Sequence, residues 1–600
     1  MDKKNTVIGI LLLVAAFGVF FYGQRFAPPA PPAPEVVPVQ APLPTATNQA
    51  APTESSMTSS PADAEFAALA GENANEVLTI LENDFVRVSF TNFGGAIGDV
   101  AFKHYTDAVD SSLPFVFNHP RVEPILAITN VPGIGPKTAF KLVSATNSEV
   151  VYRAVLEGRL EVTRRYSLGT GAEGSDPYLI RHDTAMRDLS GKGSPSMNAG
   201  LSLGTSSLVS PNDYGQFLNV MSWDGEDETL TKPGELKGGG FLAAIGLKDG
   251  ASKSSLTKGG EAVWAAVKNQ FFVSVYTGDT PGFSTTTRRV ELPPFPGSTR
   301  ANEGITGVLN YTVPAVAGDQ VAALGGDLYV GPKEYDRLRD FENKQSEVMQ
   351  FAPYFFSKIF LSGVVGPILN LTMVTIERWI GNWGVAIILM TLLLKLVTLP
   401  FTLAASRSAK KMAKLQPLMK EVREKFKDQP QKLNEATLKI FKENKVNPMG
   451  GCIPILITMP LFVAFFAMLQ GTAELRFQGF LWVTDLSAPD TVARIFGLPI
   501  NIMPLLMGAT MIYQMKLTPT PTTDNAQAQM MKFMPIVFTL ICYNFAAALA
   551  LYSTVNGLFT IAQQIIVNKT TKDDGAVVNP TEPVKSSAWN PKKKIARKKK

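Results

Sequence analysis

The chain has 600 residues, of which 18% are charged and 45% are apolar, and its formal net charge is +6. Such averages are typical neither of a soluble enzyme nor of a bundle made only of membrane spans. Residues from about 25 to 345 are polar and glycine-rich, whereas residues from about 350 to 570 contain long apolar runs. We therefore expect one water-exposed part and one membrane-embedded part.

The first segment, residues 1–25, contains an apolar run from Val7 to Tyr22 that follows two lysines. This pattern fits either a cleaved signal peptide or a retained anchor. Prolines follow where a cleavage site would have to end, which favours a transmembrane anchor, and the preceding lysines place its amino terminus in the cytosol. Residues 26–75 are rich in proline and alanine and predict an extended periplasmic linker.

Residues 76–345 predict a periplasmic all-β domain. Period-two segments such as Val86–Phe90 and Phe272–Tyr276 recur between clusters of Gly, Pro, Asn and Asp. A large β-sandwich is the expected architecture. The three histidines have no metal-ligand spacing, and both cysteines lie in apolar runs further along the chain. Neither a zinc site nor a disulfide framework is therefore expected here.

Residues 350–570 predict a membrane-embedded core. Residues 354–380 are apolar but include Lys358, Pro367 and Glu377, which favours a helix lying at the outer interface over a span. The remaining apolar runs are close to, or somewhat shorter than, the roughly 20 residues that cross a bilayer. They predict spans at residues 382–401, 452–470, 498–515, 532–545 and 548–567. With the amino-terminal anchor these make six transmembrane helices.

Basic residues set the expected orientation of these spans. Residues 402–450 contain 12 Lys and Arg against 5 Asp and Glu, whereas residues 471–498 contain only Arg476 and Arg494 as basic residues. The positive-inside rule then places the first loop and the carboxyl terminus in the cytosol, in agreement with six spans. Residues 403–446 hold two helix-favouring stretches parted near Asp428-Gln-Pro430, which predicts a cytosolic helical hairpin.

The last segment, residues 571–600, predicts a basic cytosolic tail. Its final nine residues hold seven cations, namely Lys592, Lys593, Lys594, Arg597, Lys598, Lys599 and Lys600. Such a cluster suits a phosphate-rich partner such as ribosomal RNA. Anionic lipid headgroups would attract the tail equally well, so both interpretations stay open.

Lys395 is the most informative single residue, because it lies inside a predicted span. An ammonium at the centre of a span costs about 2.5–3.5 kcal/mol on insertion scales, so it normally faces water or a partner. Thr391 and Thr398 lie four residues before it and three after it, on the same helical face. These residues predict a hydrophilic groove. The alternative is that the lysine stem reaches the cytosolic boundary near Pro400.

Other residues in the spans extend this hypothesis. Gln514 and Ser553 are polar candidates for the same groove, although hydrogen bonds between helices would explain them as well. Flexible methionines and flat aromatic rings suit a surface that accepts many apolar sequences. The candidates for this apolar slide are Met459, Phe462, Met468, Met534 and Phe538. Ordinary packing or lipid-facing positions explain them equally well.

Motifs for catalysis are missing from the sequence. It contains no GxxxxGK[ST] phosphate loop, no GxSxG elbow, no HExxH and no acidic pair within the predicted spans. We therefore expect no cofactor and no enzymatic activity.

Several motifs of the membrane core resemble those of the YidC membrane protein insertase family. The strongest runs from Asn447 to Phe462, as Asn-Pro-Met-Gly-Gly-Cys-Ile-Pro-Ile-Leu-Ile-Thr-Met-Pro-Leu-Phe. Further matches are Gly381-Asn-Trp-Gly384, Leu486-Ser-Ala488 and Phe533-Met-Pro535. The resemblance covers residues 350–570 strongly. It extends more weakly through Leu328-Tyr-Val-Gly-Pro332 and Asn92-Phe-Gly-Gly95 to the periplasmic domain of Gram-negative members.

The resemblance implies a five-helix insertase core with a hydrophilic groove and a periplasmic β-supersandwich. The groove cation of the family is an arginine, and Lys395 stands at the matching position. Tyr552 matches the first residue of a tyrosine pair whose second member is Ser553 here. Lysine keeps the charge but lacks the bidentate fork of arginine. The turn of the family between the last two spans reads Ala546-Ala-Ala548 in this chain, so its geometry is not predicted.

The resulting hypothesis is a multi-pass insertase and chaperone of the bacterial inner membrane. Its expected partners are nascent inner-membrane proteins, the Sec translocon, the ribosome through the basic tail, and the lipid bilayer. One alternative is a transporter or channel in which Lys395 binds an anionic solute, although no internal repeat supports it. A third is a carbohydrate-active periplasmic domain, which rests on fold analogy alone.

Overall fold

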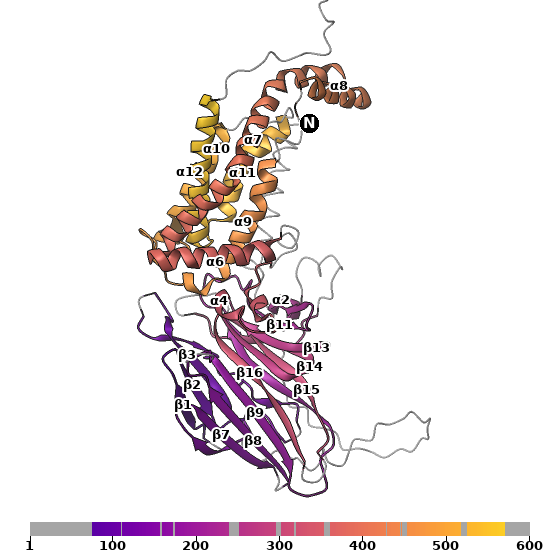
Figure 1. Ribbon diagram of the computed structural model, residues 1–600, viewed down its shortest axis with the longest axis vertical. Coiled ribbons are helices and arrows are strands. Elements are labelled where there is room, and N and C mark those ends of the chain that lie inside the picture. Colours follow the sequence, from indigo (N-terminus) through magenta and orange to yellow (C-terminus); the bar gives the residue numbers. More distant parts are fainter. Residues whose placement is uncertain are drawn as a thin grey trace, which may run out of the picture. The chain divides into compact units, whose positions relative to one another are not determined.

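The computed structural model describes residues 75–570, except 110, 132, 157–158, 172–174, 239–250, 296–301, 317–319, 353–360, 428, 445, 447–452 and 518–524. The chain separates into two compact units, which we describe separately (Figure 1). The β unit contains residues 27–351 and 470–477, and the helical unit contains residues 1–26, 352–469 and 478–600. The predicted anchor at 1–25, the linker up to residue 74 and the tail at 571–600 lie outside the described residues.

The β unit consists of a four-stranded and a twelve-stranded sheet, in which all strand pairs of the described residues are antiparallel. The small sheet has the order β1 (Leu78–Glu82), β2 (Val86–Thr91), β3 (Ala96–Thr106), β4 (Pro114–Phe117). The large sheet contains β5 (Ile128–Thr129), β6 (Lys141–Ala145), β7 (Glu149–Leu156), β8 (Leu160–Leu168), β9 (Leu179–Asp188), β10 (Met197–Ser207), β11 (Asn219–Trp223), β12 (Glu228–Thr231), β13 (Ser255–Lys268), β14 (Phe272–Leu292), β15 (Asn302–Val313) and β16 (Val321–Pro332). Short helices are α2 (Pro233–Leu236), α4 (Tyr335–Leu338), η3 (Gln345–Met349) and η5 (Ala473–Leu475).

Strand β14 organises the large sheet, because its two halves pair with different neighbours. Residues 272–278 pair with β16, and residues 284–292 pair with β15. The main path of the sheet runs β12-β11-β13-β14-β16-β9-β8-β7-β6, while β10 joins β15 and β5 beside it. Alternate side chains of β8 and β9 are buried, as a sheet with one face on a core requires.

The two sheets meet at a glycine turn between β2 and β3. Arg164 of β8 is completely buried, and its guanidinium donates a hydrogen bond of 2.7 Å to the carbonyl of Gly94. Tyr166 donates one of 2.7 Å to the carbonyl of Gly95. Both glycines have positive φ, and a Cβ on Gly95 would lie 3.0 Å from the ring of Phe140. A glycine pair is therefore required by both conformation and space, which gives the Asn92-Phe-Gly-Gly95 motif a structural role.

A second buried cation of the β unit, Lys333, follows directly after β16. Its ammonium has no hydrogen-bond partner among the described residues and lies 4.6 Å from the centre of the Phe217 ring. Burial disfavours the charged form and lowers the pKa of Lys333 to about 7. The unfolded chain therefore binds an extra proton between about pH 7 and the ordinary lysine pKa of 10.5. Through this residue, folding stability increases as the pH rises across that window.

We predict that Lys333→Met stabilises the β unit at pH 7 and weakens the rise in stability from pH 7 to pH 10. The expected gain at pH 7 is on the order of 1–3 kcal/mol, because a buried amine without a partner is replaced by an apolar chain. Calorimetry of the purified full-length protein at both pH values measures this change. The control is Lys253→Met, which replaces an exposed lysine of the same unit. Equal pH dependence in both variants would contradict the prediction.

The helical unit contains seven helices within the described residues, together with a short β-hairpin (Figure 1). The helices are α6 (Ser362–Ile380), α7 (Trp383–Lys425), α8 (Pro430–Glu443), α9 (Ile453–Gly471, whose last two residues belong to the β unit), α10 (Ile502–Leu517), α11 (Asn525–Ile541) and α12 (Ala547–Thr570). In the hairpin, β17 (Thr491–Ile495) pairs with β18 (Leu498–Asn501). Of the described helices, α7 is long and apolar enough to cross a membrane by length and composition. The six predicted spans therefore stay a prediction.

Helix α7 is continuous through two segments that the sequence separated, the span at 382–401 and the first arm of the hairpin at 403–446. Asn382 begins it, because its side-chain oxygen accepts a hydrogen bond of 3.0 Å from the amide of Val385. Beyond Pro400 the sequence changes from apolar to basic but stays rich in alanine, lysine and leucine, which are strong helix formers. Polarity therefore changes along this helix without a break in its backbone.

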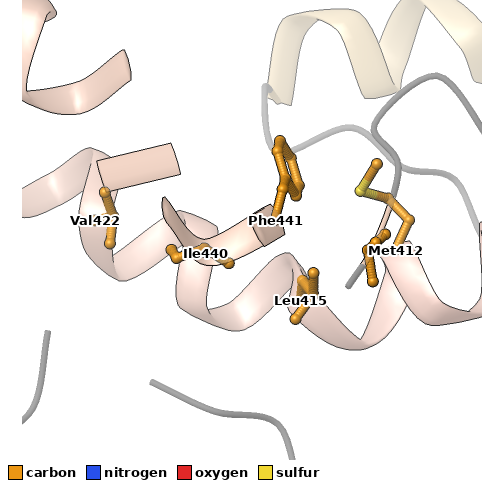
Figure 2. Close-up of a cluster of buried hydrophobic side chains, with 6 residues drawn as sticks. Met412, Leu415, Val422, Ile440 and Phe441 are labelled. Carbon is orange, nitrogen blue, oxygen red and sulfur yellow. The ribbon is translucent and has the colours of Figure 1, made fainter. Parts of the chain in front are cut away.

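Helix α8 is the second arm of the predicted cytosolic hairpin. It lies beside the end of α7, and apolar side chains of both helices form one buried cluster (Figure 2). Its buried members are Met412, Leu415 and Val422 of α7, Ile440 and Phe441 of α8, and Val446, which follows α8. The basic residues of this region thus belong to a small packed helical hairpin that has its own apolar core.

The helix bounds differ from the sequence prediction most clearly at residues 498–501, which were assigned to a span. These residues form β18, and α10 begins only at Ile502. The physical reason is turn chemistry: Phe496 and Gly497 both have positive φ and connect two strands that include the β-branched residues Val492 and Ile495. Likewise, α11 begins at Asn525 and ends at Ile541, whereas the predicted span was 532–545.

Candidate functional site

The candidate site is centred on Lys395, which α7 places inside the helical unit. The side chain is 6% exposed, and its ammonium donates a hydrogen bond of 2.9 Å to the hydroxyl of Thr560 on α12. That hydroxyl in turn donates to the carbonyl of Asn556, at 2.7 Å. No ion pair of Lys395 occurs among the residues that the structure describes. A neutral hydroxyl is therefore the observed protein partner of this cation.

A second polar contact joins the same two helices. The amide nitrogen of Gln563 donates to the hydroxyl of Thr402 at 3.1 Å, and both side chains are buried. Thr402 follows Lys395 by seven residues, about two helical turns, so the two residues share one face of α7. Together, the Lys395–Thr560 and Thr402–Gln563 contacts form what we call the polar seam between α7 and α12.

A small cavity of about 20 Å³ lies beside Lys395. Its lining comes from three helices: Thr391, Leu394, Lys395 and Thr398 of α7, Leu461 of α9, and Tyr552 and Asn556 of α12. A volume of this size accommodates about one water molecule. The hydroxyls of Thr391 and Thr398 donate to carbonyls of their own helix, at 2.7 and 2.8 Å. The Thr398 hydroxyl also lies 3.4 Å from the backbone carbonyl of Lys395, to which it donates. The two threonines therefore shape the cavity, and their hydroxyls bond to backbone carbonyls and not to the Lys395 ammonium.

The structure thus brings together four of the predicted groove residues, namely Lys395, Thr391, Thr398 and Tyr552. The other two, Gln514 and Ser553, do not line this cavity. Gln514 is half-buried on α10, and the Ser553 hydroxyl is buried with no hydrogen-bond partner among the described residues. The structure thus groups predicted residues of α7 and α12 around one cavity and leaves out those at 514 and 553, while the hydrophilic groove itself stays a prediction.

The structure likewise separates the five residues of the predicted apolar slide. Phe462 packs against Phe538, with ring centres 5.7 Å apart, while Met459 and Met534 are exposed. Met468 is completely buried and cannot belong to an accessible surface. We correct the prediction accordingly and keep the other four residues as the apolar face. The cause is helical geometry, because Met468 lies nine residues from Met459 and points to another side of α9.

An aromatic contact connects the apolar face to the cavity. Tyr552 lines the cavity and stacks on Phe465, with ring centres 4.3 Å apart and an interplanar angle of 7°. Its ring also lies 6.4 Å from that of Phe462. Tyr552 therefore stands at the border between the polar seam and the apolar face.

Thr560 and Thr402 are site residues that the sequence reasoning missed. The signal was present in α12, where Tyr552, Asn556 and Thr560 follow one another at intervals of four and Gln564 continues the series. Residues at this interval lie on one face of a helix. Testing each span for such a polar stripe would have identified Thr560.

The alanine turn before α12 has a definite structural role. The amides of Ala547 and Ala548 donate to the carbonyls of Ala488 and Leu486, at 2.8 and 2.9 Å. The first amides of a helix lack partners within the helix, so the Leu486-Ser-Ala488 segment satisfies them. The alanine side chains are buried there, and larger groups would obstruct this close backbone contact.

The fold and the site define a chain with a helical unit, in which a cation is buried between two helices and α7 is long and apolar enough to cross a membrane, and with a large antiparallel β unit. Residues 375–574 match the family model described as "60Kd inner membrane protein". A membrane protein insertase YidC of Chlorobium limicola is 30% identical over 527 residues, which cover 84% of this chain and 85% of that protein. One of Prosthecochloris aestuarii is 28% identical over the full length of both chains, and one of a Geobacter species is 37% identical over 53% of this chain and 55% of that protein.

The chain therefore belongs to the YidC membrane protein insertase family, a family of non-enzymatic proteins of the inner membrane. A solved structure described as an active YidC insertase is 17% identical and covers 83% of this chain and 94% of that chain, with a TM-score of 0.31. A galactose mutarotase related enzyme from Lactobacillus acidophilus is 9% identical and covers 42% of this chain and 97% of that chain, with a TM-score of 0.28. At these scores, neither structural likeness supports a conclusion about function.

We predict that Thr560→Val destabilises the helical unit by about 1 kcal/mol, because Lys395 loses its hydroxyl acceptor in an apolar surrounding. Unfolding of the purified protein in mixed micelles measures the difference. The matched control is Thr554→Val, since Thr554 lies on the same helix and its hydroxyl donates to the carbonyl of Ala550 in the same way. Equal destabilisation by both substitutions would show that the contact with Lys395 contributes nothing.

Proposed function

We propose that this protein inserts newly made inner-membrane proteins into the lipid bilayer and assists their folding. The observation that supports this proposal most directly is the Lys395 ammonium, which is buried between helices and bonded to a neutral hydroxyl. A cation without a neighbouring carboxylate attracts polar and acidic groups strongly, because a low-dielectric surrounding screens little. A hydrophilic segment of a substrate is the ligand that this chemistry suits.

The proposed step exchanges one partner of Lys395 for another. An ammonium has three N–H donors, and one of them is used by Thr560. The adjacent cavity holds about one water and no polypeptide. A hydrophilic tail or loop therefore enters as α7 and α12 separate along the polar seam, and it replaces Thr560 and the cavity water around the cation.

The apolar segment of the substrate follows a different path. It leaves along the apolar face formed by Met459, Phe462, Met534 and Phe538 and passes into lipid. Burial of its apolar surface, at roughly 25 cal/mol per Å², supplies the free energy. The exposed Met459 and Met534 and the half-buried rings of Phe462 and Phe538 can adapt to many sequences, which suits a protein that accepts diverse substrates.

Transport of an anionic solute gains no support from the cavity. Its volume of about 20 Å³ is far below the 300–1,000 Å³ that small-molecule sites commonly have. A substrate that itself parts the helices does not require a preformed chamber of that size. Insertion is therefore the function that the geometry supports better.

The orientation and the partners are part of the same proposal. The excess of basic residues at 402–450 places the hairpin of α7 and α8 in the cytosol, and the β unit then lies in the periplasm. Six spans, with both termini in the cytosol, agree with this orientation. The basic tail contacts the ribosome, and the protein acts alone or with the Sec translocon.

The charge at position 395 is tested by replacing it in cells depleted of the native insertase. We expect Lys395→Met to slow insertion of a single-span substrate with an acidic translocated tail by at least about fivefold, the factor that corresponds to roughly 1 kcal/mol. Lys395→Glu should slow it further through repulsion, and Lys395→Arg should retain insertion. Protease protection of the translocated tail gives the rate.

Two controls separate the charge from other effects. Lys411→Met removes a lysine from an exposed position of the same helix and should leave insertion unchanged. A substrate with a neutral tail should be less sensitive than the acidic one to Lys395→Met. Normal insertion of both substrates by the Met and Glu variants would refute the role of this charge.

The proposed ribosome contact has its own test. Deletion of residues 592–600 should weaken co-sedimentation of the purified protein with ribosomes in neutral detergent, because seven cations then no longer displace counterions from RNA. The binding of the intact chain should also fall steeply with added salt. If ribosome binding is unchanged but binding to anionic vesicles is lost, the tail is a lipid contact and this part of the proposal is wrong.

A further inference from the structure

The β17–β18 hairpin presents an apolar tip that nothing in the described part of the helical unit covers. Phe496, at the turn, is fully exposed, and Leu498 is 70% exposed. Val492 and Ile495 on β17 are exposed as well, and Arg494 is the single charged residue between positions 491 and 501. A two-stranded hairpin is marginally stable by itself in water, so this one needs support from its surroundings.

That support comes from a polar network at the base of the hairpin. Asn501 is completely buried, and its amide side chain donates to the carbonyl of Tyr543 at 2.7 Å and to the side-chain oxygen of Asn544 at 3.2 Å. The Tyr543 hydroxyl donates to the carbonyl of Pro499 at 2.8 Å. Thr491, on the opposite strand, donates to the side-chain oxygen of Asn501 at 2.7 Å.

The carboxylate of Asp490 adds a second fixed point to this base. It accepts 2.6 Å and 3.1 Å hydrogen bonds from the amide of Met503 and the indole of Trp482. Met503 lies in the first turn of α10, so the hairpin is held to the helix that follows it. The base is therefore rigid, while the tip projects from it.

The backbone of the tip points to an external contact. Phe496 has a φ of +50°, a left-handed conformation that is unfavourable for a bulky side chain. The glycine at position 497 has a positive φ at no such cost, so the turn itself does not require an aromatic residue at its first central position. The strained and exposed phenylalanine is stabilised only if its ring is buried against something other than the described residues of this chain.

The surface next to the hairpin indicates what that contact is. β18 passes into α10 without a linker, and Leu505 and Leu506 near the beginning of α10 are exposed apolar residues. Leu481, on the neighbouring turn, is also exposed. The protein is an inner-membrane protein, so an exposed apolar surface that continues along such a helix faces lipid. Trp482, whose indole donates a hydrogen bond at one end, and Arg494 are residue types that commonly lie among the lipid headgroups.

We propose that the β17–β18 hairpin is a lipid-inserting wedge, with Phe496 and its apolar neighbours among the acyl chains and Arg494 at the headgroups. Phe480 lies against Gly384 near the beginning of α7, so the wedge belongs to the end of the bundle where α7 begins. Its rigid base fixes how deeply this end of the bundle sits in the bilayer. The inference is separate from insertion activity and rests only on the membrane location of the chain.

Depth-dependent fluorescence quenching tests the proposal on the full-length protein in phospholipid vesicles. Phe496→Cys carries an environment-sensitive label, after replacement of Cys452 and Cys542 by alanine. Val143→Cys is the matched control, because Val143 is an exposed apolar residue on strand β6 of the β unit. Ile495→Cys is a second hairpin site in case one label perturbs the turn. The quenchers are acyl-chain nitroxide lipids and aqueous iodide on both sides of the membrane.

The labels at 496 and 495 should be quenched by the acyl-chain nitroxide and protected from iodide, and the label at 143 should show the reverse. Iodide quenching at 496 and 495 equal to that at 143 would overturn the proposal. A second copy of the chain could also shield the tip. If the protection of these labels from iodide disappears on about tenfold dilution of the protein with lipid, the hairpin is a self-association surface. That result would equally overturn the proposal of a lipid-inserting wedge.

Discussion

An ammonium inside a helix bundle must find hydrogen-bond acceptors, and this requirement shapes the centre of the helical unit. Lys395 meets it with the hydroxyl of Thr560, which brings α7 and α12 into register. The Thr402–Gln563 contact two turns further on maintains the same register. The remaining donors of the ammonium have a cavity of about 20 Å³ beside them, room for one water molecule. A carboxylate in place of Thr560 would neutralise the cation and remove its attraction for an incoming polar segment.

The start of α7 and α12 and the polar seam between these helices are held by different kinds of interaction. Near the start of α7 and α12, backbone hydrogen bonds from Ala547 and Ala548 and the buried side chain of Asn501 tie several segments together. The polar seam is held by hydrogen bonds between side chains, each worth about 1 kcal/mol or less in a membrane. The separation of α7 and α12 that we propose therefore breaks only these side-chain contacts of the seam and leaves the backbone hydrogen bonds at the start of α12 intact.

Much of this organisation was predictable from sequence, for reasons that differ between elements. Lys395 was identifiable because a cation in an apolar run is costly, and its threonine neighbours because of helical spacing. The partner Thr560 lies 165 residues away, and no local pattern specifies which helix faces α7. The buried position of Met468 depends on the rotation of α9, which an apolar run with no polar face leaves undefined. Strand β18 was assigned to the following span because Leu498, Pro499 and Ile500 are as apolar as that span, and only the Phe496-Gly497 turn separates them from it.

The central claim is that a substrate contacts the seam with its polar segment and the apolar face with its membrane segment. Site-specific photo-cross-linking to an arrested nascent chain with one span tests this claim directly. A cross-linker at Thr398 should capture the hydrophilic segment, one at Phe538 should capture the apolar segment, and one at the exposed Leu558 of α12 should capture neither. Equal cross-linking from all three positions, or none from Thr398 during insertion, would contradict the account.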